Sequence, residues 1–361
     1  MRRWVAIAAG LLLGALLSTG DATGQKGSPG SVLPRNGKIV FTVDGMGGRT
    51  DLCLMSPDGK GRKRLTRAAG GDAEAAWSPD GRRLAFSRNK TPRVVGSAEG
   101  RDMRIYLMRP DRSTRSPSPG SSDWPGDGTP VWSPDGGSIA FLDYPWRGFG
   151  PSLWAMRADG TQRRKLLSLA GKPSWSPEGR TLVSTGVLDG VPTAVSSAGE
   201  IRWRLDGSGW RFSAPAWSPD GREIALAGSK GDDRGIFLVD ADGTDLRRIT
   251  LRGTSPIWSP DSSMIAFADP QPFDRMSLQV VGRSGDGLRE VAFDHRSAIW
   301  SLDGTRLAYS HGGDLFTVVP DGSKARRLTS TIGIDEDQPA WQPVRSDGVA
   351  NAWAKSGSRL C

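Results

Sequence analysis

The sequence contains few of the residues that metal sites and nucleophilic active sites need. Two of its 361 residues are cysteines, Cys53 and Cys361, and two are histidines, His295 and His311. With two cysteines, no metal-binding cysteine cluster is possible. No Gly-x-Ser-x-Gly nucleophile elbow and no phosphate-binding glycine loop occurs. Catalysis needs a nucleophile, a base and an orienting group that converge, so these absences favour a binding protein over an enzyme.

The sequence also lacks an apolar run long enough to span a membrane. The longest such run, Val5–Leu17, is shorter than the roughly 20 residues that a spanning helix needs. It follows Arg2 and Arg3 and precedes small residues, a pattern typical of a cleavable signal peptide; a short membrane anchor is the alternative. We expect residues 1–24 to be the signal peptide and the Gly/Ser/Pro-rich residues 25–36 to be a flexible linker. The mature protein is then periplasmic or extracellular, without an integral membrane domain.

Basic residues outnumber acidic ones, 48 to 39, which gives a formal net charge of +9. A basic exported protein is drawn to acidic polymers and anionic surfaces. No nucleic-acid-binding motif is present, and no motif implies a cofactor. The expected partner is therefore another protein or an acidic cell-envelope polymer, and no specific nucleic acid.

Tryptophan is abundant, and half of the 14 copies are periodic. Trp-Ser-Pro-Asp-Gly, or a close variant, begins at Trp77, Trp132, Trp175, Trp217, Trp258, Trp300 and Trp341. Proline, aspartate and glycine suit successive positions of a tight turn. Short strand–turn–strand units cannot bury both faces alone, so they stack around an axis. We expect each repeated Trp to be largely buried where its blade meets the next.

Three further strands complete each repeat. The second has the pattern Ile-Ala-Phe, and the third has apolar sequences such as Ile-Tyr-Leu-Met. The fourth has the pattern Arg-Leu-Thr and follows an Asp-Gly turn. The second repeat has no clear fourth strand, and the fourth repeat departs from the pattern. The chain begins with the strand Ile39–Phe41, which has no Trp element, and ends with Trp341, which has no following strand. Pairing these two ends would close the ring and remove an exposed sheet edge.

The sequence therefore predicts an all-β fold, a seven-bladed β-propeller of four-stranded blades over residues 37–343, with a disordered tail at 344–361. The motif set resembles the TolB-type, WD-repeat-like β-propeller family across that range. The resemblance implies a propeller and favours a protein-binding or ligand-binding scaffold. Some propellers are lyases or hydrolases, so an enzyme with a polar or metal site among its loops is the alternative.

Up-and-down strands place the Ser-Pro-Asp-Gly and Asp-Gly turns on one face of the ring and the loops of variable length on the other. Variable loops on a rigid scaffold are where binding usually occurs. Residues 87–104 form a long, basic loop, and residues 142–152 contain Tyr144, Trp146 and Phe149 beside Arg147. Aromatic residues near an arginine are typical of recognition surfaces; alternatively, these rings cover the propeller mouth as a plug.

A second candidate site is a polar rim. Arg88, Asp143, Asp269 and His311 each lie two residues beyond an Ile-Ala-Phe strand, so they have equivalent places in the ring. They are either a shared binding rim or solvated loop starts. A metal held by His311 with Asp143 or Asp269 would favour the enzyme alternative.

Three further patterns have structural interpretations. Acidic residues before the Trp elements (Asp72, Glu74, Asp127, Asp294, Asp335, Glu336 and Asp337) are interpreted as solubilising, with cation or basic-partner binding as the alternative. The segment 240–245 resembles the start of a calcium loop but coincides with an Asp-Gly turn and lacks the downstream Glu. Cys53 either pairs with Cys361 or packs as a free thiol between blades.

Overall fold

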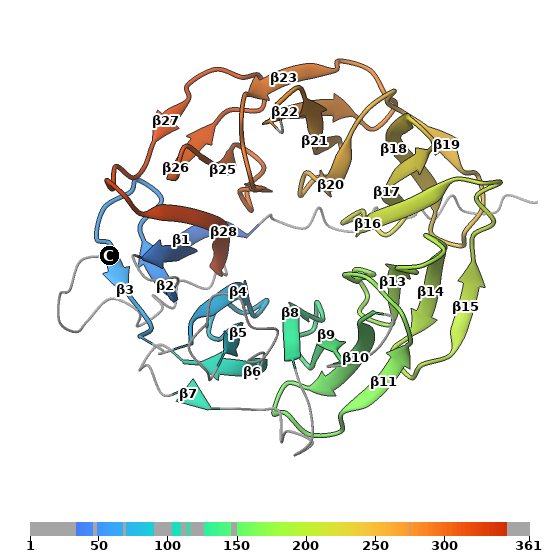
Figure 1. The fold of residues 1–361 in the computed structure, drawn as a ribbon, viewed down its shortest axis with the longest axis horizontal. Helices are drawn as coiled ribbons and strands as arrows, with labels where there is room; N and C mark the ends of the chain where they lie inside the picture. Colours follow the sequence, from blue (N-terminus) through green and yellow to red (C-terminus); the bar gives the residue numbers. More distant parts are fainter. Residues whose placement is uncertain are drawn as a thin grey trace, which may run out of the picture. The chain divides into compact units, whose positions relative to one another are not determined.

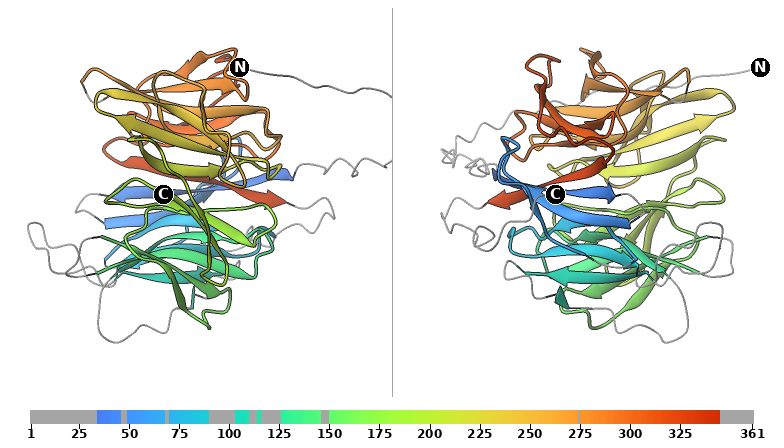
Figure 2. Two further views of the ribbon diagram at one scale, coloured as in Figure 1. Left: turned by 90° about the vertical axis from the view of Figure 1, so that its right-hand side faces the viewer. Right: turned by 60° about the vertical axis from the view of Figure 1, so that its left-hand side comes forward.

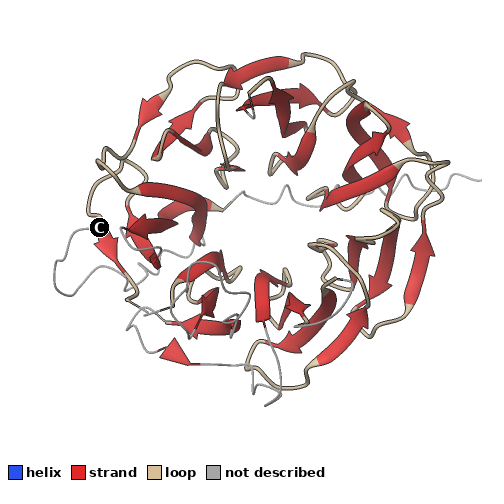
Figure 3. Cartoon of the chain, viewed as in Figure 1, coloured by secondary structure: helices blue, strands red, loops and turns tan. Residues whose placement is uncertain are grey.

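The computed structural model describes residues 34–45, 49–67, 70–89, 103–109, 114–115, 126–145, 150–273 and 275–344. The chain divides into two units, Met1–Val32 and Leu33–Cys361, and all of the described residues belong to the second. The predicted signal peptide and the predicted tail beyond Val344 therefore lie outside them. The described residues form strands joined by turns and loops, without a helix (Figure 3).

Seven antiparallel sheets of four strands form a ring, and each sheet is one blade (Figure 1). The first strand of each blade lies toward the centre of the ring. For blades 1 to 7 the first strands are β28 (Asp335–Val344), β4 (Asp72–Trp77), β8 (Gly126–Trp132), β12 (Ser174–Trp175), β16 (Arg211–Trp217), β20 (Thr254–Trp258) and β24 (Ala298–Trp300). The second strands are β1 (Arg35–Gly45), β5 (Leu84–Asn89), β9 (Ser138–Tyr144), β13 (Thr181–Thr185), β17 (Glu223–Lys230), β21 (Met264–Gln271) and β25 (Leu307–His311).

The two outer strands of each blade complete the sheet. In the same order, the third strands are β2 (Arg49–Met55), β6 (Met103–Met108), β10 (Ser152–Arg157), β14 (Pro192–Ser196), β18 (Asp233–Asp240), β22 (Arg275–Gly282) and β26 (Asp314–Val318). The fourth strands, at the circumference, are β3 (Lys63–Arg64), β7 (Thr114–Arg115), β11 (Arg164–Leu167), β15 (Ile201–Arg204), β19 (Arg247–Arg248), β23 (Arg289–Ala292) and β27 (Arg326–Arg327).

Blade 1 is assembled from two distant parts of the chain. β28 pairs with β1 from Arg35–Val344 to Asp44–Asp335. The Gln342 side chain accepts the N–H of Lys38 at 3.2 Å and donates to the Gly81 carbonyl of blade 2 at 2.8 Å. The pairing covers a sheet edge that would otherwise be open. Ring closure, predicted from the offset repeats, is confirmed.

The hydrophobic core lies between the blades. Val40 of blade 1 packs with Leu84 and Phe86 of blade 2, whereas Ala85 contributes to the cluster that joins blades 2 and 3. The seven clusters each join two neighbouring blades. Because successive side chains of a strand point to opposite faces, the large–small–large pattern of the second strand lets adjacent blades approach closely.

The repeated Trp residues link the inner strands of neighbouring blades. Five indole Nε1 groups donate, at 3.0–3.2 Å, to a carbonyl in the first strand of the preceding blade: Trp77 to Ala340, Trp132 to Ala76, Trp175 to Val131, Trp258 to Ala216 and Trp300 to Ile257. Six of the seven indoles are buried. Trp217 is half-buried, and its Nε1 has no hydrogen-bond partner in the described part of the chain. The predicted burial is therefore confirmed for six copies, whereas Trp217 is only partly buried, packed against the cluster that joins blades 4 and 5.

The structure also changes details of the sequence interpretation. The propeller begins at Arg35 and ends at Val344, slightly beyond the predicted 37–343. The second repeat does have a fourth strand, because β7 pairs with β6 at Leu107 and Met108. This strand has two residues and lacks the Arg-Leu-Thr pattern, so its sequence gave no signal.

Candidate binding face and inter-blade cavities

The two faces of the ring differ in how they connect strands (Figure 2). The turn face carries the Ser-Pro-Asp-Gly and Asp-Gly turns, and the loop face carries the connections from second to third strands and from each blade to the next. The turns are self-contained: Ser133 donates to Asp135 at 2.5 Å and accepts the N–H of Ser138 at 2.9 Å. The hydrogen bonds from Ser133 and the Gly137 N–H hold the pKa of Asp135 below its usual value.

The loop face carries most of the exposed large apolar side chains. Eight such side chains are exposed among the described residues, and six lie in loop-face connections: Val187, Leu188, Leu251, Phe273, Phe293 and Ile332. Phe273 and Ile332 are 92% and 98% exposed. The other two, Ile201 and Leu288, lie at or beside fourth strands. The six loop-face side chains are distributed over the connections of blades 4 to 7, and this face is the candidate interaction surface.

Blade 3 holds a largely buried arginine against aromatic rings. Arg163 donates to the two oxygens of Asp127 at 2.7 and 2.9 Å, and Asp143 lies 3.6 Å from the same guanidinium. The guanidinium lies 4.9 Å from the ring centre of Phe141 and 4.8 Å from that of Trp154. A bidentate ion pair and cation–π contacts in a partly desolvated place reinforce one another. We call this arrangement the guanidinium site of blade 3.

Blades 1 and 2 have guanidinium sites at the equivalent place. Arg88 donates to Asp72 at 2.7 and 2.9 Å and lies 5.3 Å from the Phe86 ring centre. In blade 1, Arg62 pairs with Glu336 and lies 5.8 Å from the ring centre of Phe41, the counterpart of Phe86.

The carboxylates of these sites correct the sequence interpretation. Asp72, Asp127 and Glu336 were expected to be solubilising, yet each is at most 1% exposed and ion-paired. Each lies five residues before the Trp of its blade. In the other four blades this position is occupied by a residue without a carboxylate: Ala170, Phe212, Gly253 and His295. Burial lowers the pKa of His295. Buried acid–arginine pairing at this position is thus confined to three adjacent blades.

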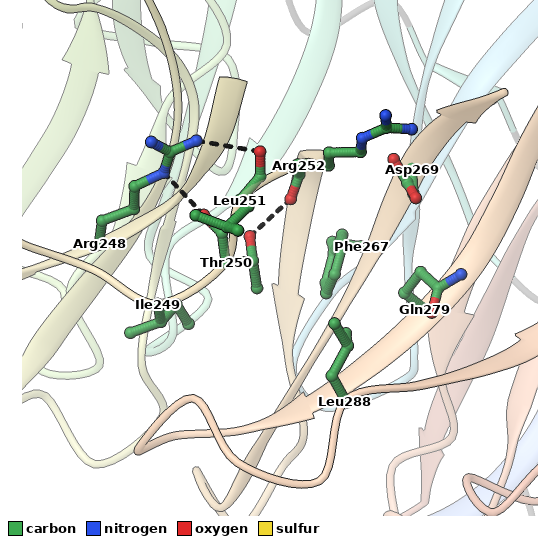
Figure 4. Close-up of a pocket in the computed structure, with 9 residues that line it drawn as sticks. All are labelled: Arg248, Ile249, Thr250, Leu251, Arg252, Phe267, Asp269, Gln279 and Leu288. Atoms are coloured by element: carbon green, nitrogen blue, oxygen red, sulfur yellow. Dashed lines mark hydrogen bonds between the residues drawn. The ribbon is translucent and has the colours of Figure 1, made fainter. Parts of the chain in front are cut away.

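Cavities lie at the equivalent place in blades 4 and 6. The cavity of blade 6 has a volume of about 560 Å³ and is lined by Phe267, Asp269, Gln279, Leu288 and the segment 248–252 (Figure 4). The cavity of blade 4 has a volume of about 360 Å³ and is lined by small residues such as Ala170 and Gly186 together with larger ones, among them Leu188, Ile201 and Arg204.

The four residues of the predicted polar rim have separate environments. Arg88 is held by Asp72, and His311 Nδ1 lies 2.8 Å from the Asp294 carbonyl oxygen. Asp143 lies beside Arg163, and its pKa is raised by burial and by the nearby Asp127 charge. Asp269 faces the blade 6 cavity.

No hydrogen bond or ion pair joins any two of these four within the described ranges. Likewise, no three His, Cys, Asp or Glu side chains of the described residues are grouped to hold a metal ion.

The aromatic loop is described only at its start. The Tyr144 hydroxyl lies 3.4 Å from Thr129 Oγ1 on the inner strand β8. Thr129 donates its N–H to Glu74 of blade 2 at 2.7 Å, and the Glu74 N–H donates to Gln338 of blade 1 at 3.1 Å. Trp146, Arg147 and Phe149 lie outside the described residues, so recognition surface and plug both stay predictions.

Three smaller predictions have different outcomes. The segment 240–245 forms an ordinary turn, in which Asp242 accepts the N–H and hydroxyl of Thr244. Cys53 is part of a disulfide bond, while Cys361, the other cysteine, lies outside the described residues. No helix in the described residues is long and apolar enough to cross a membrane.

Comparisons with known proteins agree with this fold. Residues 202–350 match the TolB beta propeller domain family. A segment of 120 residues is 38% identical to the Tol-Pal system protein TolB of Gluconobacter oxydans and covers 32% of this chain. The match spans about a quarter, 24%, of that relative. The resemblance of the repeats to TolB-type repeats is confirmed.

Solved structures show the same fold at low identity. The crystal structure of TolB from Acinetobacter baumannii has a TM-score of 0.58 at 18% identity and covers 87% of this chain and 69% of that one. Oligogalacturonate lyase from Vibrio parahaemolyticus has a TM-score of 0.62 at 12% identity, with 86% and 92% covered. At these identities the likeness concerns the fold alone, which binding proteins and enzymes share.

Proposed function

We propose that this chain, whose repeats are of the TolB β-propeller type, is an exported scaffold that binds a protein partner on its loop face. The observation that supports the proposal is the concentration of exposed apolar side chains in loop-face connections, among them Phe273 and Ile332. Exposed apolar side chains that lie near one another are candidates for contact with a protein partner. The charge of +9 adds attraction to acidic proteins and acidic envelope polymers.

The architecture suits this role. Seven inter-blade clusters and the closing β28–β1 pairing hold the loops on a rigid ring. A pre-organised surface loses little conformational freedom on binding. The Gluconobacter oxydans relative is a Tol-Pal system protein, which makes a cell-envelope protein assembly the first place to seek the partner.

The enzyme alternative has weaker support. The fold neighbours include a lyase, but no group of three potential metal-ligating side chains is found among the described residues. The scaffold proposal is therefore preferred.

Site-specific photocrosslinking tests the proposal. A photoreactive residue at Phe273 on the loop face, introduced into the exported protein in its own cells, is expected to form a discrete crosslink to another protein. The matched control carries the same residue at Asp242, which lies in a turn-face hairpin, and is expected to give none. Crosslinks from position 242 but not from 273 would place the binding surface on the wrong face for this proposal.

A further inference from the structure

The cavity of blade 6 is lined by counterparts of the guanidinium site of blade 3. Phe267 corresponds to Phe141, and Asp269 corresponds to Asp143, two residues further along the strand. Gln279 lies opposite Phe267, as Trp154 lies opposite Phe141. Blade 6 thus keeps one aromatic face and one carboxylate of the site.

The arginine itself is missing from blade 6. Arg163 follows the turn glycine Gly160 by three residues, and Leu288 has the same place after Gly285. Leu288 lines the cavity without filling it. The second carboxylate is also absent, because Gly253 stands where blade 3 has Asp127, and a Cβ at Gly253 would lie 2.5 Å from the Phe267 ring.

Asp269 is left without the partner that its counterpart has. Its Oδ2 accepts the Gln271 amide at 3.0 Å, but its Oδ1 is buried and has no hydrogen-bond partner among the described residues. Burial raises the pKa of Asp269 even though the charge of Arg252 acts in the opposite direction. A buried carboxylate oxygen without a donor is costly, so this position favours a cationic donor from outside the chain.

The two arginines of the cavity wall do not provide that donor. Arg248 donates to the carbonyls of Thr250 and Leu251, each at 2.9 Å, and lies 5.2 Å from the Trp210 ring centre in blade 5. Arg252 extends toward Asp269 (Figure 4) and acts on it through its charge, without a hydrogen bond to it within the described residues. Its side chain is exposed, so it can move aside when another guanidinium enters.

We propose that the blade 6 cavity binds an arginine side chain of the protein partner, with the guanidinium lying against Phe267 and donating to Asp269. The inference rests on the proposed function, since that arginine belongs to a protein docked on the loop face. Exposed Leu251 and Leu288 at the cavity provide apolar contacts for the methylene groups of such an arginine. Blade 3 holds its own Arg163 by the same kinds of contact, a carboxylate and the face of an aromatic ring.

The probe is an acetylated and amidated pentapeptide with arginine at its centre and glycine elsewhere. The matched peptide has citrulline, which is neutral and nearly isosteric, in place of arginine. Titration of the full-length mature protein, followed by NMR, is expected to show at least about tenfold tighter binding of the arginine peptide, the effect of one charge-assisted hydrogen bond. Equal binding of the two peptides would overturn the inference.

Two variants of the protein locate the site. Asp269→Asn is expected to weaken arginine-peptide binding roughly tenfold or more without lowering the melting temperature, because no internal ion pair is lost. Leu288→Arg supplies an internal guanidinium, as in blade 3, and is expected to block the peptide. Asp233→Asn removes an exposed loop-face carboxylate and is the charge-matched control, with binding unchanged. Unchanged binding in Asp269→Asn would refute the assignment, even if the Leu288→Arg protein did not fold.

The two proposals fail separately. A crosslink from position 273 together with no preference for the arginine peptide would leave the scaffold in place and reject the arginine site. Arginine-peptide binding that depends on Asp269, without any protein crosslink from the loop face, would support the site and reject the protein scaffold.

Discussion

Replacing Trp300 by Phe tests whether the hydrogen bonds from Trp Nε1 groups to the preceding blade stabilise the propeller. Trp300 is 4% exposed, and its Nε1 donates to the Ile257 carbonyl of blade 6 at 3.2 Å. Phenylalanine keeps an aromatic ring but removes the donor and part of the volume. The lost hydrogen bond should cost about 1 kcal/mol, and the cavity left by the smaller ring about 1 kcal/mol more. We expect the free energy of unfolding to fall by about 2 kcal/mol.

Trp217→Phe is the matched control. Trp217 is half-buried, and its Nε1 is buried without a partner in the described residues. The substitution therefore removes an unsatisfied donor, which offsets the loss of packing, and we expect a change of less than about 1 kcal/mol. Urea unfolding followed by tryptophan fluorescence and circular dichroism measures both. Equal destabilisation by the two substitutions would refute the view that the Nε1 contacts contribute to stability.

Three further predictions concern closure, pH and the cysteines. Deleting residues 335–361 should lower the melting temperature sharply, because β1 would be left with an open edge. Deleting 345–361 is the control, because it also removes Cys361, the second cysteine, but keeps β28. Equal melting temperatures of the two deletion variants would contradict closure. The pKa of Asp135 is held below its usual 3.8. Its charged form therefore contributes stability above about pH 4, and this stability is lost as the pH falls through the lower pKa of the folded state. Asp135→Asn should make acid unfolding, monitored by circular dichroism, less steep; an unchanged profile would argue against this. Thiol titration of the unfolded, unreduced exported protein should find no free thiol and, after reduction, two, since Cys53 is disulfide-bonded; two free thiols before reduction would exclude the bond.

The position of the binding face could be predicted from the sequence, but its exposed side chains could not. Turn residues at fixed offsets assign each connection to a face, so the loop face follows from strand order alone. Which of its side chains are exposed does not follow. Phe273 and Phe293 are exposed on the loop face, whereas Phe267 lies in a cavity wall, and sequence periodicity carries no signal that separates them.

The sequence by itself determined the number of blades, their four-strand pattern and the closure of the ring. These follow from short-range rules, because a Ser-Pro-Asp-Gly turn and a large–small–large strand have the same consequences in every repeat. The offset between the first strand pattern and the last Trp element fixed how the ends meet.

Only the tertiary structure decided which charged residues are buried and ion-paired. Asp72 and Asp127 resemble solubilising acids in sequence. Their burial depends on Arg88, which reaches Asp72 from the second strand of blade 2, and on Arg163, which reaches Asp127 from directly before the fourth strand of blade 3. Long arginine side chains span several residues, so no fixed spacing marks such a pair. Asp269 differs from Asp143 because Leu288, directly before the fourth strand of blade 6, stands where blade 3 has Arg163. Whether a carboxylate is paired or free is therefore set by packing between strands distant in sequence.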